Sequence, residues 1–300
     1  MADTDISATL LERIEEKKKG LDSRRPLPKE ALKRLQEGFR LYHTYHSNAI
    51  EGNTLTLSET KLVIEEGITV GGKPLNEYME ARNTSKAYDL IEGLAREKEI
   101  YPVTIQQIHE TVTKGLIEDA GKYRTKNVRI TGAIKTPPDF TKVPGLVDDL
   151  LENLKRTGRH PIQKTACLHH KLVEIHPFVD GNGRVARLLT NLVLMRNGYP
   201  VVVLRKEDRA KYYKCLRSAD VGNPKPFANF IARAVDESLM EYLSIFGGEN
   251  ELLPLREFVK ETHYSQEYLS LRARQGALDV VKLNGIWHST KKALKEYTRR

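Results

Sequence analysis

Residues 174–189 read EIHPFVDGNGRVARLL and combine a histidine, an aspartate, two glycines, an asparagine and two arginines with an apolar run. Pro177 predicts the end of a helix over 161–175, because the residue before a proline avoids the α conformation. The apolar residues that follow Gly183 predict the next helix. The stretch is therefore a short loop, rich in charged and polar residues, between two helices.

The glycines and arginines of this loop have the composition of an anion-binding site. Gly181 and Gly183 let the backbone approach a ligand closely and adopt positive φ angles. Free N–H groups and the positive end of the helix dipole attract phosphate oxygens at a helix start. Arg184 and Arg187 lie three residues apart on the first turn, so both guanidinium groups can reach one phosphate group.

Two further residues of the loop carry reactive groups. The Asp180 carboxylate, beside a phosphate site, is a ligand that Mg²⁺ can share with the phosphates. His176 titrates near neutrality and can take a proton from an attacking hydroxyl. The stretch lacks the Gly-Lys-Ser/Thr ending of a Walker loop. The residues alone therefore predict a nucleotide-polyphosphate site with its own general base.

The segment HPFVDGNGRVAR at 176–187 resembles the signature of the Fic domain family, His-Pro-Phe-x-x-Gly-Asn-Gly-Arg-x-x-Arg. The resemblance extends over roughly residues 40–240. GKYR at 121–124 is similar to the element that precedes the family's flap, and KNVRITGAIKTPP at 126–138 is similar to the flap. The resemblance implies a mostly α, Fic-type helical bundle with a small β-hairpin flap. It also implies an enzyme that transfers AMP from ATP, with Mg²⁺, to a hydroxyl side chain of a target protein.

The resemblance also assigns roles to the loop residues. It makes His176 the general base, Asp180 the Mg²⁺ ligand and Phe178 an inward anchor of the loop. The remaining residues would bind the nucleotide: Gly181 to Gly183 the phosphates, Asn182 the α-phosphate region, and Arg184 and Arg187 the outer phosphates.

A second motif, SNAIEG at 47–52, is similar to the inhibitory pattern of many Fic proteins, [Ser/Thr]-x-x-x-Glu-[Gly/Asn]. Ser47 and Glu51 are its specified residues, and Gly52 would end their helix. A Glu51 carboxylate that reaches Arg187 would occupy the guanidinium that the γ-phosphate of ATP needs. The motif therefore predicts a self-inhibited enzyme.

Helical periodicity and breaks divide the chain into three predicted parts. Residues 1–100 form an N-terminal helical region with the inhibitory helix over 28–52, and residues 101–246 form the catalytic core. GGENELLP at 247–254 is the predicted linker to a module over 252–300. The other predicted helices begin near Ser58 and lie over 75–98, from Thr104, from 144, and over 161–175, 183–198, 208–218 and 226–246.

The C-terminal part has a different pattern. Ser265 can cap a helix, Asn284-Gly285 predicts a β-hairpin, and a basic helix follows Thr290, as in a winged-helix or helix-turn-helix module. Residues 263–300 hold eight lysines and arginines against three acidic residues. This excess suggests DNA binding, which for a palindromic site would require a homodimer. The alternative function is therefore a DNA-binding regulator whose Fic domain senses ATP.

Bulk composition indicates to which class of protein the chain belongs. The 300 residues are 39% hydrophobic and 30% charged with a net charge of +9, which indicates a globular protein with a sizeable core. The N-terminus does not have the pattern of a signal peptide, and no membrane span is predicted. Cys167 and Cys215 alone predict a reducing, cytoplasmic location. Cys167, His170 and Glu174 lack a fourth zinc ligand, which favours helix packing.

Overall fold

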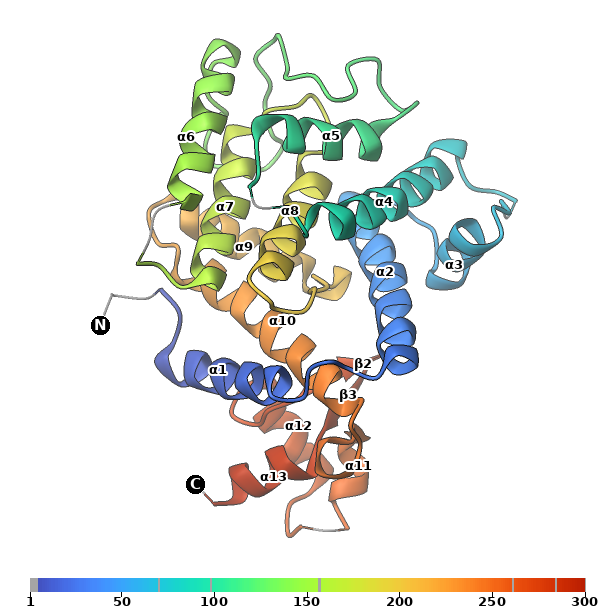
Figure 1. Cartoon of the computed structure of the whole chain (residues 1–300), viewed down its shortest axis with the longest axis vertical. Coiled ribbons are helices and arrows are strands. Elements are labelled where there is room, and N and C mark those ends of the chain that lie inside the picture. The colour runs from blue at the N-terminus through green and yellow to red at the C-terminus, as the bar shows by residue number, and fades with distance from the viewer. Residues whose placement is uncertain are drawn as a thin grey trace. The chain divides into compact units, whose positions relative to one another are not determined.

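The computed structural model of the chain describes residues 5–69, 71–97, 99–155, 158–260, 262–283 and 285–299 (Figure 1). The chain divides into two compact units, Met1–Leu11 with Gln36–Ala234, and Glu12–Leu35 with Val235–Arg300. These units do not follow the boundaries predicted from the sequence. Residues from the N-terminal helical region share the second unit with the C-terminal segment.

The prediction of a mostly α fold is confirmed. The first ten α-helices are α1 (Ala8–Asp22), α2 (Lys29–Glu51), α3 (Leu57–Glu65), α4 (Leu75–Leu94), α5 (Pro102–Thr113), α6 (Val143–Lys155), α7 (Pro161–Ile175), α8 (Asn182–Arg196), α9 (Arg209–Asp220) and α10 (Lys225–Ser244). The second unit adds α11 (Leu255–Phe258), α12 (Gln266–Arg274) and α13 (Lys291–Thr298).

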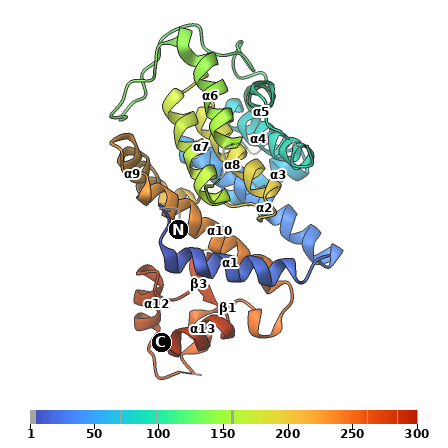
Figure 2. The same cartoon turned by 60° about the vertical axis from the view of Figure 1, so that its left-hand side comes forward.

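Helix α8 forms the centre of the first unit. Nearly all of its side chains are buried, polar and apolar alike, as expected of a helix surrounded by other elements. Helices α4, α5 and α7 pack against it (Figures 1 and 2). The loop in front of α8 is therefore held by a rigid helix on its C-terminal side and by α7 on its N-terminal side.

Three helices differ from the sequence prediction. Helix α1 is not predicted, although Leu10, Ile14 and Leu21 are buried at helical spacing. Helix α5 begins at Pro102 rather than Thr104, because Thr104 lies inside its first turn and its hydroxyl accepts the Tyr101 N–H at 3.2 Å. The predicted end of α4 at Lys98 lies outside the described residues, and α4 ends at Leu94.

The β-hairpin predicted over residues 126–138 is wrong as a pair of strands, because the segment is an irregular loop. Pro137 and Pro138 have no N–H group to donate to a ladder. Instead, Asn127 closes the base of the loop, since its side-chain oxygen accepts the Phe140 N–H at 2.9 Å. We refer to residues 126–138 as the flap.

The second unit contains a three-stranded antiparallel sheet in the order β1 (Leu253–Pro254), β3 (Ile286–Ser289), β2 (Val281–Leu283). The predicted hairpin is confirmed by the pairing of β2 with β3, although Asn284 itself lies outside the described residues. Strand β1 comes from the segment predicted as a linker, so that segment is part of the folded unit. The Ser265 cap of α12 is also confirmed.

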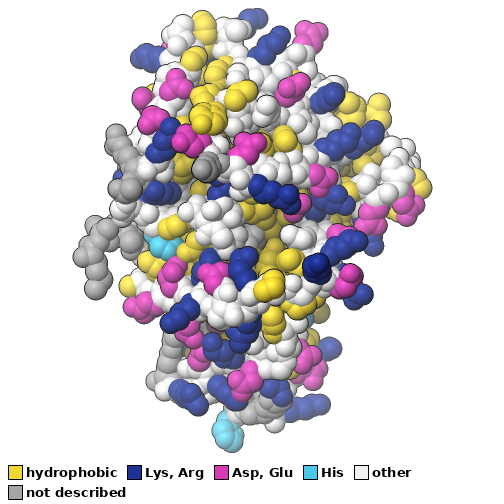
Figure 3. Space-filling model, in the orientation of Figure 1, with side chains coloured by type: hydrophobic (Ala, Val, Ile, Leu, Met, Phe, Trp, Pro, Cys, Tyr) yellow, Lys and Arg dark blue, Asp and Glu magenta, His cyan; other side chains and the backbone are white. Residues whose placement is uncertain are grey.

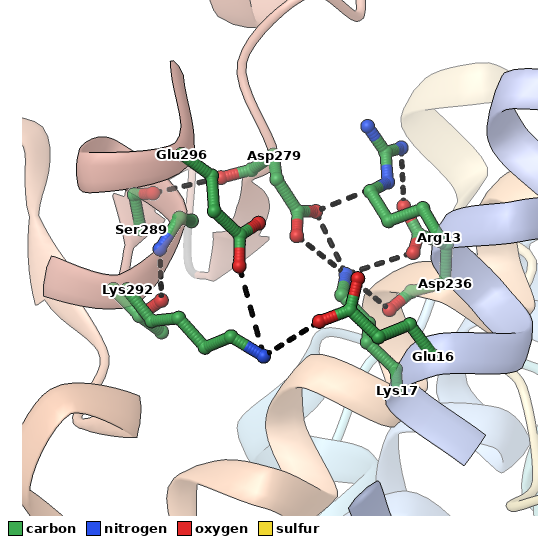
Figure 4. A network of polar contacts seen from close by, with 10 residues as sticks. Arg13, Glu16, Lys17, Asp236, Asp279, Ser289, Lys292 and Glu296 are labelled. Atoms are coloured by element: carbon green, nitrogen blue, oxygen red, sulfur yellow. Dashed lines mark hydrogen bonds and ion pairs between the residues drawn. The ribbon is translucent and has the colours of Figure 1, made fainter. Parts of the chain in front are cut away.

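A cluster of buried charges lies inside the second unit (Figure 4). Lys17 Nζ lies 2.7 Å from Asp236 Oδ1 and 2.7 Å from Asp279 Oδ2. Arg13 forms an ion pair with Asp236 as well. Burial alone would raise the pKa of Asp236, but the neighbouring Lys17 and Arg13 hold it below its usual value. Two cations and two anions thus neutralise each other away from water.

The rim of this cluster is more exposed. Lys292 Nζ lies 3.0 Å from Glu16 Oε1 and 3.6 Å from Glu296 Oε1 (Figure 4). Ser289 donates to the Asp279 carbonyl at 2.7 Å, which ties β3 to the loop before β2. Within the second unit, α1 is therefore joined to the C-terminal segment by ionic contacts.

We expect Lys17→Met to lower the free energy of unfolding by about 3–5 kcal/mol, because it leaves two buried carboxylates with Arg13 as their one remaining cation in the cluster. Urea unfolding of the full chain measures the change. Adding Asp279→Asn should recover part of the loss, since it removes one of the uncompensated charges. Lys19→Met, an exposed position on the same helix, is the control and should change stability by less than about 0.5 kcal/mol. Equal effects at both lysines would contradict a role for the cluster.

Candidate active site

A pocket of about 720 Å³ opens in front of α8 in the first unit. It is lined by the flap, by the loop between α7 and α8, by Glu51 and by side chains of α7 and α9. His176, Asp180, Asn182, Gly183 and Arg184 all contribute to its wall. The volume suits a small-molecule site, for which about 300–1,000 Å³ is usual.

His176 ends α7 in a left-handed conformation, with φ 50° and ψ 60°. Its Nδ1 lies 3.3 Å from the Val173 carbonyl oxygen. A proton on Nδ1 can therefore donate to that carbonyl, which leaves the lone pair of Nε2 available at the pocket. Burial lowers the pKa of His176, so the neutral ring predominates at pH 7. The ring thus has the protonation state of a general base.

The loop after His176 is closed by its own side chains. The Asn182 side chain accepts the Phe178 N–H at 3.0 Å and donates to the Phe178 carbonyl at 2.9 Å. Phe178 is fully buried and points inward. The resemblance assigns Asn182 to the α-phosphate region, but its buried amide is engaged inside the loop. Its observed contacts are therefore those of a structural clamp.

His109 of α5 supports the same loop, and sequence reasoning missed it. Its ring stacks on Phe178 with 3.7 Å between centroids. Nδ1 accepts the Gly121 N–H at 2.9 Å, so Nε2 carries the proton and donates to the Asp180 carbonyl at 3.0 Å. Burial lowers the pKa of His109 to about 4, which keeps this ring neutral. No local sequence pattern indicates a residue so far from the motif.

The two glycines of the loop are required for different reasons. Gly181 has a φ of 78°, and a Cβ there would lie 2.9 Å from Thr113 Cγ2. Gly183 lies inside α8, but a Cβ there would lie 2.2 Å from Glu51 Oε1. Only Gly181 therefore has the positive φ expected of both. Gly183 instead leaves room for a carboxylate against the start of α8.

Arg184 is 2% exposed and has two acidic neighbours. Its Nη2 donates to Asp180 Oδ2 at 2.9 Å, and its Nη1 lies 3.1 Å from Glu80 Oε1. Among the described residues, no hydrogen-bond partner faces its buried Nε. A buried donor without a partner at the pocket wall favours an anionic ligand. The Glu80 contact was not predicted from the sequence.

Asp180 provides the chemistry of a magnesium ligand. Its side chain is 60% exposed and lies at the pocket, next to the predicted phosphate site. A single carboxylate fits Mg²⁺, which usually takes one or two carboxylates and completes its shell with phosphates and water. Among the residues that the structure describes, no group of three or more His, Cys, Asp or Glu side chains could hold a metal ion.

Arg187 donates hydrogen bonds to Ser47 and Glu51, the specified residues of the SNAIEG motif. Its Nη2 donates to Glu51 Oε1 at 2.7 Å and to the Ser47 carbonyl at 2.8 Å. Its Nε donates to the Ser47 hydroxyl at 2.9 Å. Ser47 and Glu51 are four residues apart, so they lie on one face of α2 and reach the same guanidinium. The spacing in the motif thus has a direct geometric reason.

The side chains considered as zinc ligands have other partners. His170 Nε2 lies 2.9 Å from Asp220 Oδ1. Glu174 lies 2.7 Å from Lys135 Nζ of the flap. Cys167 has a free thiol. Glu174 therefore ties the flap to α7 instead of binding a metal.

The chain is similar to known proteins in sequence and in fold. The model of the Fic/DOC family matches residues 99–194. Protein adenylyltransferase Fic of Nematostella vectensis is 38% identical over 244 residues, which are 80% of this chain and 57% of that protein. The protein of the same name from Drosophila willistoni is 35% identical over 82% of this chain and 50% of its own length. The chain thus spans about half the length of these relatives.

Solved structures share the fold. A Fic domain containing signaling protein from Bacteroides thetaiotaomicron aligns with a TM-score of 0.73 at 29% identity, over 81% of this chain and 98% of its own. Residues 134–508 of Fic-1 from C. elegans align with a TM-score of 0.72 at 32% identity, over 79% of this chain and 72% of that one. With this likeness in both sequence and fold, the chain belongs to the Fic/DOC family.

Proposed function

We propose that the protein transfers AMP from ATP to a hydroxyl side chain of a target protein and that it inhibits itself through Glu51. The observation that carries the proposal is the neutral His176 ring at a pocket that also holds the N-terminus of α8 and Arg184. The relatives named protein adenylyltransferase support the same reaction class.

In the proposed reaction, the target hydroxyl oxygen attacks the α-phosphorus of ATP and forms the new O–P bond. The bond from the α-phosphorus to the bridging oxygen breaks, and pyrophosphate leaves with that electron pair. His176 Nε2 takes the hydroxyl proton. The N–H groups at the start of α8 and the guanidinium groups of Arg184 and Arg187 would bind the phosphates and orient the triphosphate.

Mg²⁺ would be held by Asp180 together with phosphate oxygens, and it would offset the negative charge of the triphosphate and the leaving group. The other site residues keep the roles that their contacts support. Gly181 and Gly183 let the backbone approach the phosphates, and Phe178 and Asn182 keep the loop in shape.

The contact between Glu51 and Arg187 supports self-inhibition. Glu51 Oε1 occupies the space in front of Gly183, at the positive end of the α8 dipole. A carboxylate there takes the place that a phosphate group of ATP would need, and it also occupies the arginine. Displacement of Glu51 would therefore admit the nucleotide in its productive position.

The alternative function, a DNA-binding regulator, has less support. Of the basic residues over 263–300, Lys292 forms ion pairs with Glu16 and Glu296, and Arg272 donates to the Tyr297 hydroxyl at 2.8 Å. Arg300, which was counted in the basic excess, lies outside the described residues. On the face drawn in Figure 3, basic and acidic side chains are interspersed. DNA binding, a homodimer and a winged-helix identity remain predictions.

The cytoplasmic location of the protein also remains a prediction. Both cysteines are free thiols, which supports the proposed cytoplasmic location. In the described part of the chain, no helix has the length and hydropathy to cross a membrane.

We expect Glu51→Gly to increase AMP transfer by about tenfold or more, because a charge-assisted contact worth about 1.5–3 kcal/mol no longer blocks Arg187. Incubation with α-labelled ATP, Mg²⁺ and cell lysate measures the transfer. Glu37→Gly, an exposed position on the same helix, controls for the loss of helix propensity and should leave the transfer unchanged. Equal labelling by wild type and Glu51→Gly would remove the inhibitory role.

We expect His176→Ala, added to Glu51→Gly, to reduce transfer by about 10²–10⁴-fold, because the attacking hydroxyl loses its base. ATP affinity, measured by calorimetry, should stay within about twofold, since a base adds little to ground-state binding. His263→Ala, at an exposed histidine, is the control and should affect neither quantity. Loss of ATP binding together with activity would instead make His176 a ligand contact.

We expect Arg187→Ala to leave the enzyme inactive, although it also breaks the contact with Glu51. The same guanidinium is needed to orient the triphosphate, and such positioning is worth about 10²-fold or more. Labelling by Arg187→Ala and by Glu51→Gly is compared side by side. If the two variants were equally active, the arginine would serve inhibition alone.

A further inference from the structure

Arg124, the last residue of GKYR, is buried and donates to backbone carbonyls of separate segments. Its Nε donates to the His176 carbonyl at 2.8 Å. Its Nη1 donates to the Lys126 carbonyl at 3.0 Å, and its Nη2 donates to the Pro138 carbonyl. Its own N–H donates to the Pro177 carbonyl at 2.9 Å. One planar guanidinium therefore joins three points of the backbone.

These three points belong to two parts of the pocket wall, the flap and the loop between α7 and α8. Lys126 and Pro138 are the first and last residues of the flap, which has no strand pairing of its own. His176 and Pro177 begin the loop that ends at α8. Arg124 therefore sets the position of the flap relative to His176. The ion pair of Lys135 and Glu174 also contributes to this position.

His176 needs such support. In the described part of the chain, it is the single residue other than glycine with a positive φ. This conformation is unfavourable for a residue with a Cβ, so its neighbours must hold it. The bond from Arg124 Nε to the His176 carbonyl acts on the residue whose ring orientation matters most.

We propose that Arg124 is a positioning residue, which holds the His176 ring and the flap in one arrangement through their backbone carbonyls. The proposal rests on the transfer reaction proposed above, in which His176 is the base. Arg124 does not line the pocket and is placed to act through His176 and the flap.

The positive charge of Arg124 also affects the pKa of His176. Burial lowers the pKa of His176 most, and the guanidinium of Arg124 lowers it further, whereas Glu51 and Asp180 raise it. Removal of the charge at 124 should raise the pKa of His176, so the acid limb of the rate profile should move to higher pH. Arg124→Lys keeps the charge but cannot reach three carbonyls in one plane, so the two effects can be separated.

The test compares Arg124→Lys and Arg124→Gln in the Glu51→Gly background, with Arg233→Lys and Arg233→Gln at an exposed arginine of α10 as matched controls. Both Arg124 variants should lower the maximal rate of AMP transfer by about tenfold to a hundredfold, the order of magnitude of a small misplacement. The ATP concentration for half-maximal rate should change by less than about threefold, because Arg124 lies outside the pocket wall. Only Arg124→Gln should move the acid limb.

A second measurement is independent of activity. Amide exchange at Phe178 reports the loop, and tryptic cleavage after Arg129 and Lys135 reports the flap. Arg124→Lys should accelerate both processes, because one group ties both segments. Asn127→Ala, which opens only the base of the flap, should accelerate the cleavage alone.

The outcomes are distinct. Full activity of Arg124→Lys, or a loop that exchanges at the wild-type rate, would overturn the positioning role. A loss of ATP binding in both Arg124 variants would overturn it too, because that indicates damage to the whole pocket. If the Glu51→Gly protein transfers no AMP, the proposed function fails. Exchange, cleavage and an NMR titration of the His176 ring then still decide whether Arg124 holds the loop and the flap.

Discussion

The site depends on the backbone of the loop between α7 and α8, which turns through two left-handed residues. His176 has a φ of 50° and Gly181 a φ of 78°. The first is unfavourable by about 1–2 kcal/mol for a residue with a Cβ, so the loop keeps its shape only while buried partners satisfy it. The Asn182 amide and the His109 ring supply those contacts. This backbone conformation places His176 Nε2 and the N-terminus of α8 at the same pocket.

The same arrangement creates an anion site that the protein occupies with its own carboxylate. Glu51 is the last residue of α2, where the negative end of that helix dipole disfavours a carboxylate by about 0.3–1 kcal/mol. Arg187 and the start of α8 offset this cost. The C-terminus of α2 repels the Glu51 carboxylate, whereas Arg187 and the N-terminus of α8 attract it. A more highly charged anion or a small shift of α2 can therefore displace this carboxylate. This balance gives a physical basis for the proposed self-inhibition, which has to be reversible.

The second unit shows why a charge count can mislead. The basic excess near the C-terminus suggests a nucleic-acid surface, yet the structure uses Lys292 and Lys295 in ion pairs with Glu16, Glu249 and Glu296. Lys17 and Arg13 of α1 are likewise neutralised by Asp236 and Asp279. Glu16 and Glu249 come from outside the basic segment, so local composition overstates the charge that is free to act.

The sequence by itself determined which residues form the loop and the motif that is proposed to be inhibitory. The residues from His176 to Arg187 are contiguous, and Ser47 and Glu51 share a helix face by spacing alone. Periodicity and capping residues likewise located most helices and the hairpin of β2 and β3. Only the tertiary structure decided that Glu80 of α4 faces Arg184 of α8, because the two residues lie on helices far apart in the sequence. It also brought His109 and Arg124 to the loop and left the flap unpaired. Such contacts depend on how amphipathic helices pack, and a local pattern records only that a residue will be buried, without naming its neighbour.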